Sequence, residues 1–329
     1  MSFRNGLKWL AAAALGLSLA GCGAPAQNES QSGAASSTAS AASSAVSSAA
    51  SEEKTGDKPS VLCPAGAPAL ATLGLAEEGA KIEYVEGQDM LVSELSKTDG
   101  DYDLIVAPVN VGVKTWNDAG AYQLEGVLTW GNLYVVAQDD NWNEPGKTIA
   151  LFGEQAVPGM VFTNLYPELQ AEAQYYPSVA EASAALLSGK ADSAMLAQPA
   201  AAGAINKGAD NGLALNTVAD LQSEWSAAHE AENNGYPQAA LFVKKDKAAD
   251  YADSIEALST YIAQADESKV EASINEFSPE QLGVPNAKIA ASTWKQQNIH
   301  YVPANECEED LAKFLEIFGI SIPDGLIVQ

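Results

Sequence analysis

Short apolar or alternating runs recur along the chain after its Ser-rich N-terminal part, and stretches with helical spacing separate them. Residues 60–63, 81–85 and 104–107 are three such runs, and a turn residue such as Pro, Gly or Asn closely follows each of them. Runs of this length, bounded by turn residues, predict β-strands, and the stretches between them predict helices over 67–78 and 88–97. This part of the chain therefore predicts strands that alternate with helices.

A second series of the same kind begins after the turn at 143–146, where the chain reads Asn-Glu-Pro-Gly. An Ala-rich helix is expected after the Gln-Pro pair at 198–199, and helices dominate from 248 to the end, interrupted by a short strand at His300 and Tyr301. This alternation favours parallel sheets, so we predict an α/β fold with two strand–helix series and a return strand. The other expected elements are strands over 133–136, 148–152, 171–176, 193–196 and 239–244, and a helix over 179–188.

The first residues predict export from the cytoplasm. A basic start precedes an apolar run over 10–20, which is too short to span about 30 Å of hydrocarbon, so a cleaved signal sequence is favoured over a membrane anchor. Residues 19–22 read Leu-Ala-Gly-Cys and resemble the lipobox of a bacterial lipoprotein, which implies a signal peptide over 1–21 and a lipid on Cys22. An ordinary signal peptide with a chance cysteine is the alternative.

Residues 22–57 predict a flexible tether. This segment consists mainly of Ser, Ala, Gly and Thr, contains no aromatic residue, and has Val46 as its only branched aliphatic residue. Such a composition cannot bury enough apolar surface to offset the entropy of ordering the chain. We therefore expect the lipidated Cys22 and a disordered linker to hold the folded part at the outer face of a bacterial cell membrane.

The charge balance narrows the range of partners. The chain has 43 acidic and 17 basic residues and a formal net charge of −26, and Arg4 is its only arginine. Removal of the signal peptide leaves no guanidinium group to clamp a phosphate or carboxylate, and nucleic acid is not expected as a partner. The sequence favours buried free thiols over a disulfide for Cys63 and Cys307 but leaves both open. No metal-ligand spacing is present, and neither a metal nor a cofactor is predicted.

Several short segments, taken in order along the chain, resemble one known family. They are Cys-Pro-Ala-Gly at 63–66, then 103–110, 128–134, 189–192, 196–199 and 238–243. The family is the solute-binding proteins of ABC importers, in the branch for nitrate, sulfonates, taurine and thiamine precursors (SsuA-like). The resemblance spans most of residues 58–318.

This resemblance implies a type II periplasmic-binding-protein fold, in which a hinge joins two lobes and each lobe is a mainly parallel sheet flanked by helices. On this basis one lobe combines 58–140 with 241–329, and the other lobe is 141–240. The resemblance also implies that a monomer binds a small-molecule ligand in the cleft between the lobes. The protein would then deliver this ligand to ABC permease and ATPase subunits.

Loops at the ends of the predicted strands are the expected ligand-binding positions, because open α/β sheets bind ligands beyond the carboxyl ends of their strands. Asn110 is favoured since its amide both donates and accepts hydrogen bonds, although it could instead bond to its own turn. Trp130 fits either the cleft or the core, and Tyr236 beside the hinge could cap the cleft. The predicted ligand-binding residues are Pro64, Ala65, Gly66, Asn110, Trp130, Asn132, Gly153, Gln155, Gln198 and Tyr236.

Three positions depart from the family pattern. Ala65 replaces a hydroxyl residue, Val157 replaces a threonine and Gln198 replaces a glutamate, so two hydroxyl donors and a carboxylate are absent from the expected cleft. Since arginine is absent as well, few side-chain donors remain for a small anion such as nitrate or a sulfonate. We therefore predict a neutral or mildly polar organic ligand, held by stacking and amide contacts, with anion binding by backbone N–H groups as the alternative.

Two other classes of function remain as alternatives. Some proteins of this fold are enzymes of thiamine-precursor or menaquinone synthesis, but His229 and His300 are the only histidines here and lie far from the predicted strand-end turns. The sequence has no Gly-x-Ser-x-Gly elbow, no cysteine-rich iron motif and no evident acid–base pair, so an enzyme is not expected. A lipid-anchored ligand sensor of the same fold is not distinguished from a transport protein.

Overall fold

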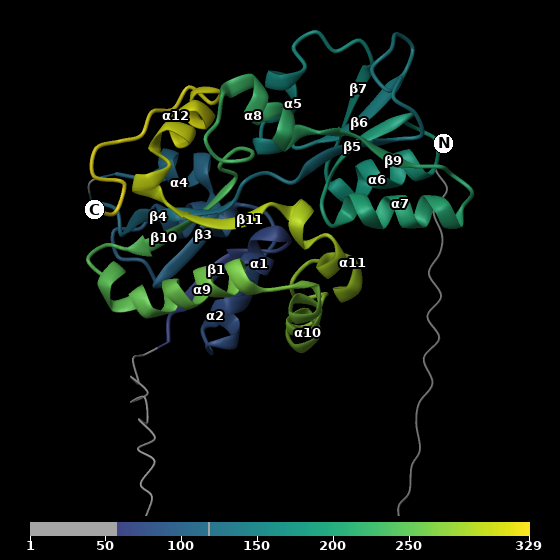
Figure 1. Cartoon of the computed structure of the whole chain (residues 1–329). Helices are drawn as coiled ribbons and strands as arrows, with labels where there is room; N and C mark the ends of the chain where they lie inside the picture. The colour runs from purple at the N-terminus through teal and green to yellow at the C-terminus, as the bar shows by residue number, and fades with distance from the viewer. Residues whose placement is uncertain (1–57, 118) are drawn as a thin grey trace, which may run out of the picture. The chain divides into compact units, whose positions relative to one another are not determined.

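The computed structural model describes residues 58–117 and 119–329, which belong to one compact unit. The predicted signal peptide, Cys22 and the predicted tether lie outside the described residues. Helices and strands alternate through most of the unit, as Figure 1 shows from the purple to the yellow end of its colour scale. Among the helices that the structure describes, none combines the length and the hydropathy that a membrane span requires.

One sheet contains six strands, which are β1 (Ser60–Pro64), β2 (Lys81–Val85), β3 (Leu104–Pro108), β4 (Tyr122–Thr129), β10 (Ala239–Lys244) and β11 (Ile299–Pro303). Their order across the sheet is β11-β4-β10-β3-β1-β2. β1 runs parallel to β2 and β3, whereas β10 is antiparallel to both β3 and β4, and β11 is antiparallel to β4. The strand predicted to return from the second series, β10, is therefore central to this sheet.

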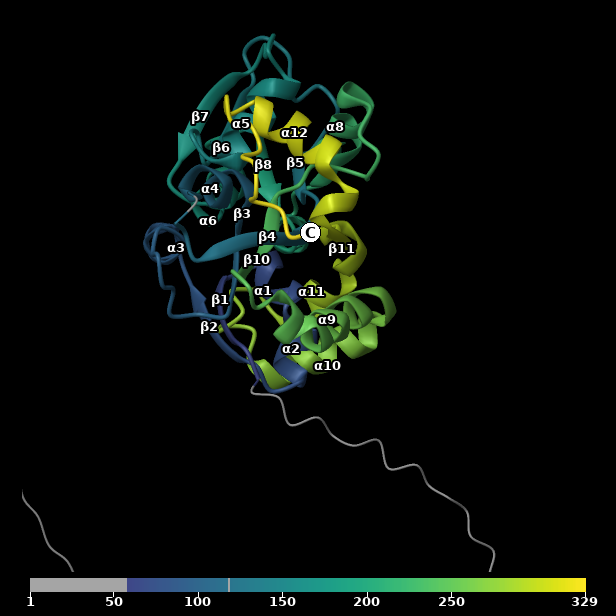
Figure 2. The same ribbon diagram turned by 90° about the vertical axis from the view of Figure 1, so that its left-hand side faces the viewer.

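Helices cover both faces of the six-stranded sheet, because consecutive residues of a strand point to opposite sides. Val61 and Cys63 of β1 belong to one buried cluster, and Leu62 between them belongs to another. Burial on both faces explains why β1 and β3 are continuously apolar in sequence. One face carries α1 (Ala67–Ala71), α2 (Leu73–Glu77), α9 (Ala252–Gln264), α10 (Glu267–Phe277) and α11 (Ala287–Ser292), and the other carries α3 (Asp89–Leu95) and α4 (Val109–Thr115), as Figure 2 shows.

The other sheet contains five strands, which are β5 (Leu133–Ala137), β6 (Thr148–Phe152), β7 (Glu172–Tyr176), β8 (Ser193–Ala197) and β9 (Asn216–Asp220). Their order is β7-β6-β8-β5-β9, with β6 parallel to β7 and β8, and β5 antiparallel to β8 and β9. Helices again cover both faces. They are α6 (Val179–Leu187) and α7 (Ala200–Asp210) on one face, and α5 (Val157–Leu165) and α8 (Leu221–His229) on the other.

The predicted fold class, two sheets flanked by helices, is confirmed, but four details differ. The sheets are mixed, because β10, β4 and β11 in one sheet and β5 and β9 in the other add antiparallel pairs. The predicted helix over 67–78 is divided at Thr72, whose N–H and Oγ1 both donate to Ala69 O. Asn110 lies in α4 and not in a turn. The sequence analysis predicts neither β4, which polar residues interrupt, nor the largely exposed β9.

The chain crosses between the two sheets at two adjacent segments. Residues 130–132 join β4 to β5, and residues 236–238 lead back to β10. The crossings lie side by side, since Tyr236 N donates to Trp130 O at 3.1 Å. Within the described residues, the predicted hinge would therefore lie at these two segments.

The strand at 133–137 lies in a different sheet from the one that the sequence division gives it. The division assigns 58–140 to the first lobe, yet β5 pairs with β8 in the five-stranded sheet, with Leu133 opposite Ala197. The turn at 143–146, close to that predicted boundary, connects β5 to β6 within that same sheet. A Pro-Gly turn marks the end of a strand equally well whether or not the chain changes sheets.

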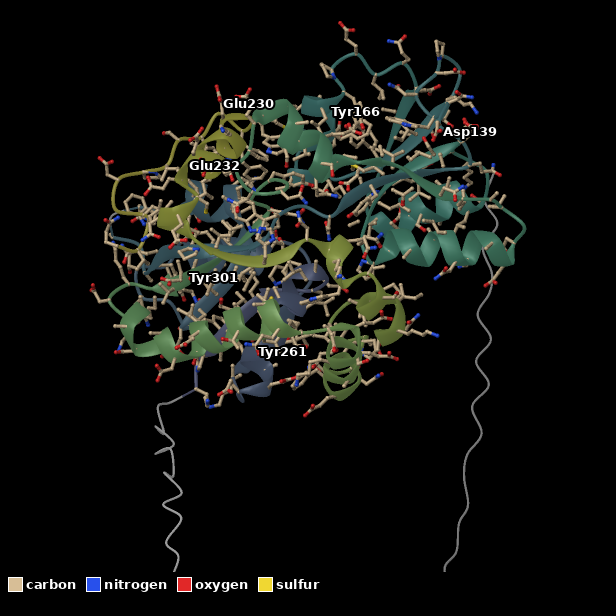
Figure 3. The ribbon with its side chains drawn as sticks, in the orientation of Figure 1. Asp139, Tyr166, Glu230, Glu232, Tyr261 and Tyr301 are labelled. Carbon is tan, nitrogen blue, oxygen red and sulfur yellow. The ribbon has the colours of Figure 1, made fainter. Side chains whose placement is uncertain are left out.

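The C-terminal helix α12 (Glu308–Glu316) makes a third connection between the lobes. It follows β11 of the six-stranded sheet but packs beside the loop after α8, where Figure 3 shows Glu232. Asp310, which is 2% exposed, accepts hydrogen bonds from Glu232 N (3.0 Å) and from N and Nδ2 of Asn233 (both 2.9 Å). Phe314 stacks on Tyr236 with ring centroids 5.8 Å apart. A division that gives the whole C-terminal part to the first lobe does not describe these contacts.

Both remaining cysteines are buried free thiols, as the sequence analysis favoured. Cys63 Sγ donates to Pro64 O at 3.4 Å, and Cys307 Sγ donates to Pro303 O at 3.4 Å. Burial raises the pKa of the Cys63 thiol well above its usual range and that of Cys307 to about 12. Neither sulfur is therefore a thiolate nucleophile at neutral pH.

Candidate functional site

A cavity of about 800 Å³ lies between the two sheets. Its walls include the segments that follow β1, β2, β6 and β8, where strands end and helices begin, and the crossings at 130–132 and 236–238. Open α/β sheets bind ligands at this end of their strands. A cavity of this volume holds a small organic molecule.

The six-stranded sheet contributes the turn after β1 and the loop between α10 and α11. Residues 64–66 of this turn line the cavity. Ala65 N donates to Val85 O at 3.0 Å. Gly66 N donates to Leu282 O at 2.8 Å. Both N–H groups of the turn are therefore used inside the protein.

The five-stranded sheet contributes the starts of α5 and α7 and one face of α6. Ala156 N and Gly159 N both donate to Gly153 O, at 2.9 and 3.0 Å. Pro158 lies in the first turn of α5 and Pro199 is the N-cap residue of α7, and a proline supplies no N–H. These helix starts consequently offer fewer free donors to an anion than helix N-termini usually do.

Mostly small side chains line the helical walls. They are spaced at i, i+3, i+4 and i+7 in both helices, so each set lies on one helix face. The small volume of most of them leaves room for a ligand between the lobes. The residues are Ala180, Ser183, Ala184 and Leu187 of α6, and Ala200, Gly203, Ala204 and Lys207 of α7.

Three carboxamide side chains line the cavity near the crossings, and they belong to Asn132, Gln198 and Gln238. Asn132 Nδ2 donates to Gln198 O at 3.0 Å, and Gln198 N donates to Asn132 O at 2.9 Å. Gln198 Oε1 accepts a hydrogen bond from Ala202 N at 3.2 Å. Asn132 and Gln198 are 3% and 6% exposed, so these amides are held in place by the fold.

Charged groups are few around the cavity. Within the described part of the chain, Glu86, Lys207 and Glu280 are the charged residues that line it. No three His, Cys, Asp or Glu side chains among residues 58–117 and 119–329 are grouped as a metal ion would require. The lining therefore carries little charge.

Half of the predicted ligand-binding residues line this cavity. Pro64, Ala65 and Gly66 come from the turn after β1, Asn132 from the first crossing and Gln198 from the end of β8. The structure thus brings together turns that are far apart in sequence.

The other half lies outside the cavity lining. Trp130 and Tyr236 are fully buried. Trp130 Nε1 donates to His300 O at 3.1 Å, and its ring stacks on His300 with centroids 5.1 Å apart. Gln155 is exposed, and Asn110 lies in α4 with a buried Oδ1. The residues concerned are Asn110, Trp130, Gly153, Gln155 and Tyr236.

Sequence reasoning did not identify Gln238, the cavity faces of α6 and α7, or the loop between α10 and α11. Gln238 opens the segment 238–243, so it lay within a recognised motif without being singled out. The small residues of α6 and α7 also match the pattern of a helix packed in a core. Only their position beside the other lobe shows that these residues line a cavity and do not pack in a core.

The two histidines, both of which the structure describes, do not line the cavity. His229 stacks on Trp225, with ring centroids 3.8 Å apart, and its Nε2 lies 2.7 Å from Asn164 Oδ1. Burial lowers the pKa of both imidazoles, that of His300 to about 4. Both rings therefore serve packing.

The comparisons with known proteins find similarity in structure only. No protein-family model matches the chain, and no curated protein matches its sequence. A solved structure described as an ABC transporter from Parabacteroides distasonis is 20% identical, covers 82% of this chain and 98% of its own, and has a TM-score of 0.68.

Two sulfonate-binding proteins are also similar. The periplasmic aliphatic sulphonate binding protein SsuA from Escherichia coli is 13% identical over 82% of this chain and 91% of its own, with a TM-score of 0.57. The alkanesulfonate-binding protein SsuA from Xanthomonas axonopodis, bound to MOPS, is 14% identical over 82% and 96%, with a TM-score of 0.51. At these identities the likeness establishes the fold: the chain has the two-lobed α/β fold of ABC-transporter solute-binding proteins, as the sequence resemblance predicted.

Proposed function

We propose that this protein is an extracytoplasmic solute-binding lipoprotein, which captures a small organic solute between its two lobes and delivers it to an ABC import permease. The cavity carries the proposal, because loops from both sheets wall it around two adjacent crossings that can serve as a hinge. The printed names of the similar structures, an ABC transporter and two binding proteins, support the same role here.

A neutral or mildly polar ligand fits this cavity better than a small inorganic anion. Ala, Pro, Gly and Val make up much of the lining, and the chain after residue 4 contains no arginine. Several N–H groups at the cavity's turns already bond within the protein. The ligand class would then differ from the sulfonates for which two of the similar proteins are named.

Lipid on Cys22 would anchor the protein, as a monomer, at the outer face of the membrane. The Leu-Ala-Gly-Cys pattern at 19–22 and the Ser-rich segment behind it support this part of the proposal. We propose binding rather than catalysis, because neither histidine lies at the cavity and the pKa of each thiol is raised by burial.

A ligand screen tests the proposed function. The exported chain with Cys22→Ser is screened by thermal unfolding against thiamine precursors, flavins, sulfonates and nitrate. We expect at least one neutral organic compound to raise the unfolding midpoint. A ligand present at 100 times its Kd adds about 2.7 kcal/mol to the free energy of unfolding, which such a scan detects.

A cavity-filling variant identifies the site. Ala184 lines the cavity and is exposed, so Ala184→Trp should fold and place an indole in the ligand's space. We expect this change to abolish the thermal shift. Ala209→Trp, at an exposed position of α7 outside the lining, is the matched control. A shift that persists in Ala184→Trp, or a screen without any stabilising compound, contradicts the proposal.

A further inference from the structure

The orientation of the Asn132 amide is set by its neighbour Gln198. Asn132 Nδ2 donates to Gln198 O at 3.0 Å, and the backbone of Gln198 donates in turn to Asn132 O at 2.9 Å. If the amide were turned by 180°, Asn132 Oδ1 would lie against Gln198 O, and two acceptors would face each other. The hydrogen bond therefore places Nδ2 next to Gln198 O and Oδ1 on the side of the amide away from it. Asn132 is 3% exposed, and its Oδ1 has no donor among the described residues.

Gln238 provides a second buried amide oxygen. Its Oε1 is buried and likewise has no donor within residues 58–117 and 119–329. Gln238 N donates to Thr129 O at 2.9 Å, which fixes Gln238 beside the crossing that contains Asn132. Both side chains line the same cavity. Buried polar atoms are nearly always hydrogen-bonded in proteins, so two unpaired acceptors at one cavity point to a ligand that donates.

The turns and helix starts at this cavity offer few backbone donors. Ala65 N and Gly66 N bond to backbone carbonyls, and so does Ala156 N. Pro158 and Pro199 carry no N–H. Lys207 is the one cationic side chain among the described lining residues, against two carboxylates. The backbone and the charges of this lining therefore offer little to an anion.

We infer that the ligand donates hydrogen bonds to Asn132 Oδ1 and Gln238 Oε1 from N–H or O–H groups of an uncharged organic molecule, such as a primary amide or an amino-substituted ring. This inference rests on the proposed function and narrows its ligand class. A sulfonate or nitrate presents only acceptors and would place oxygen against both amide oxygens. A site built to accept hydrogen bonds rejects an analogue that lacks the donor.

Matched pairs of compounds test this inference by calorimetric titration of the exported chain with Cys22→Ser. One pair is benzamide and N,N-dimethylbenzamide, and the other is 4-aminopyrimidine and 4-(dimethylamino)pyrimidine. Nitrate and ethanesulfonate are the anionic probes. We expect the donor in at least one pair to bind about tenfold or more tightly than its methylated analogue, and neither anion to bind in the cavity.

Two variants remove the acceptors. We expect Gln238→Met and Asn132→Leu each to weaken binding of the donor probe about tenfold and to leave binding of its methylated analogue unchanged. Gln238→Met is the cleaner change, because Asn132→Leu also removes the bond to Gln198 O. Gln264→Met, at the exposed end of α9, is the matched control and should bind like the unmodified protein.

The binding results separate a failure of this inference from a failure of the proposed function. The inference is overturned if an anion binds and Ala184→Trp abolishes that binding, if methylation leaves the affinity unchanged, or if Gln238→Met does not weaken binding of the donor probe. In these cases the cavity still binds a solute, so the proposed capture of a solute between the lobes stands, although binding of an anion would also overturn the proposed ligand class. If neither these probes nor the screened compounds bind at all, the proposed function fails, and this inference fails with it.

Discussion

Gly235 allows the two crossings between the sheets to lie against each other. Its φ is +109°, which residues with a side chain rarely adopt, and a Cβ at this position would lie 1.9 Å from Trp130 O. That carbonyl accepts hydrogen bonds from Tyr236 N at 3.1 Å and from Asn298 Nδ2 at 2.7 Å. It cannot move away from an added methyl group without weakening both bonds.

We expect Gly235→Ala to lower the free energy of unfolding by about 3 kcal/mol, because backbone strain and overpacking add. Gly212→Ala separates the two effects. Gly212 has a φ of +76° but no atom within 4 Å of an added Cβ, so about 1 kcal/mol of strain is expected there. Urea unfolding measures both variants. If Gly235→Ala and Gly212→Ala lower the free energy of unfolding by the same amount, the crossings tolerate a side chain at 235.

His300 makes the stability depend on pH. Its half-buried ring stacks on Trp130, and burial lowers its pKa from 6.5 to about 4. The unfolded chain takes up this proton near pH 6.5, whereas the folded chain takes it up near pH 4. The stability that the neutral ring allows is therefore fully present above about pH 6.5 and is lost as the pH falls towards 4.

We expect His300→Phe to remove part of this loss while keeping an aromatic ring against Trp130. Between pH 7 and pH 5 the unmodified protein should lose on the order of 1 kcal/mol more free energy of unfolding than the variant. This figure is already reduced for the partial exposure of the ring. Urea unfolding of both proteins at the two pH values measures this. A difference that does not change with pH would mean that the imidazole titrates normally.

At the scale of elements, α12 connects the C-terminal part of the chain to the loop after α8 through hydrogen bonds. Asp310 accepts three hydrogen bonds from residues 232 and 233 and is almost fully buried. Lys313 Nζ adds a bond to Glu230 O at 3.0 Å. A buried carboxylate with these partners holds two distant parts of the sequence together.

We expect Asp310→Ala to lower the free energy of unfolding by about 3 kcal/mol, since it leaves three donors without their acceptor. Asp310→Asn keeps one acceptor and should lose less. Glu308→Ala, at an exposed position in the first turn of the same helix, controls for the loss of a carboxylate near the helix start. Chemical denaturation compares the three variants. The role assigned to Asp310 is wrong if Asp310→Ala and Glu308→Ala lose the same amount.

The elements themselves differ in how well local sequence predicts them. β1 and β3 are buried on both faces, so they appear as continuous apolar runs and were predicted. β4 places Gln123 and Glu125 among its apolar residues, and β9 is largely exposed, so neither stands out. The division between α1 and α2 depends on a hydrogen bond from Thr72 that composition does not reveal.

At the scale of the whole molecule, one buried cluster runs through both lobes. It contains Leu62 and Ile105 of the six-stranded sheet and Leu151 of the five-stranded sheet, together with Trp130 and Tyr236 at the crossings. The two aromatic residues that the sequence analysis considered for the cleft thus pack the joint between the lobes. Their burial follows from the stacking partners His300 and Phe314, which come from the far C-terminal part of the chain.

Local sequence was sufficient for the α/β class, the two strand–helix series and most of the strand-end turns, because each depends on the spacing of apolar residues and on turn residues close together in the chain. The sheet to which β5 belongs, and the side chains that line the cavity, depend on pairs such as Asn132 with Gln198, which are 66 positions apart. No local pattern encodes such a pair. It forms only when hydrogen bonding and burial are satisfied for the whole fold at once.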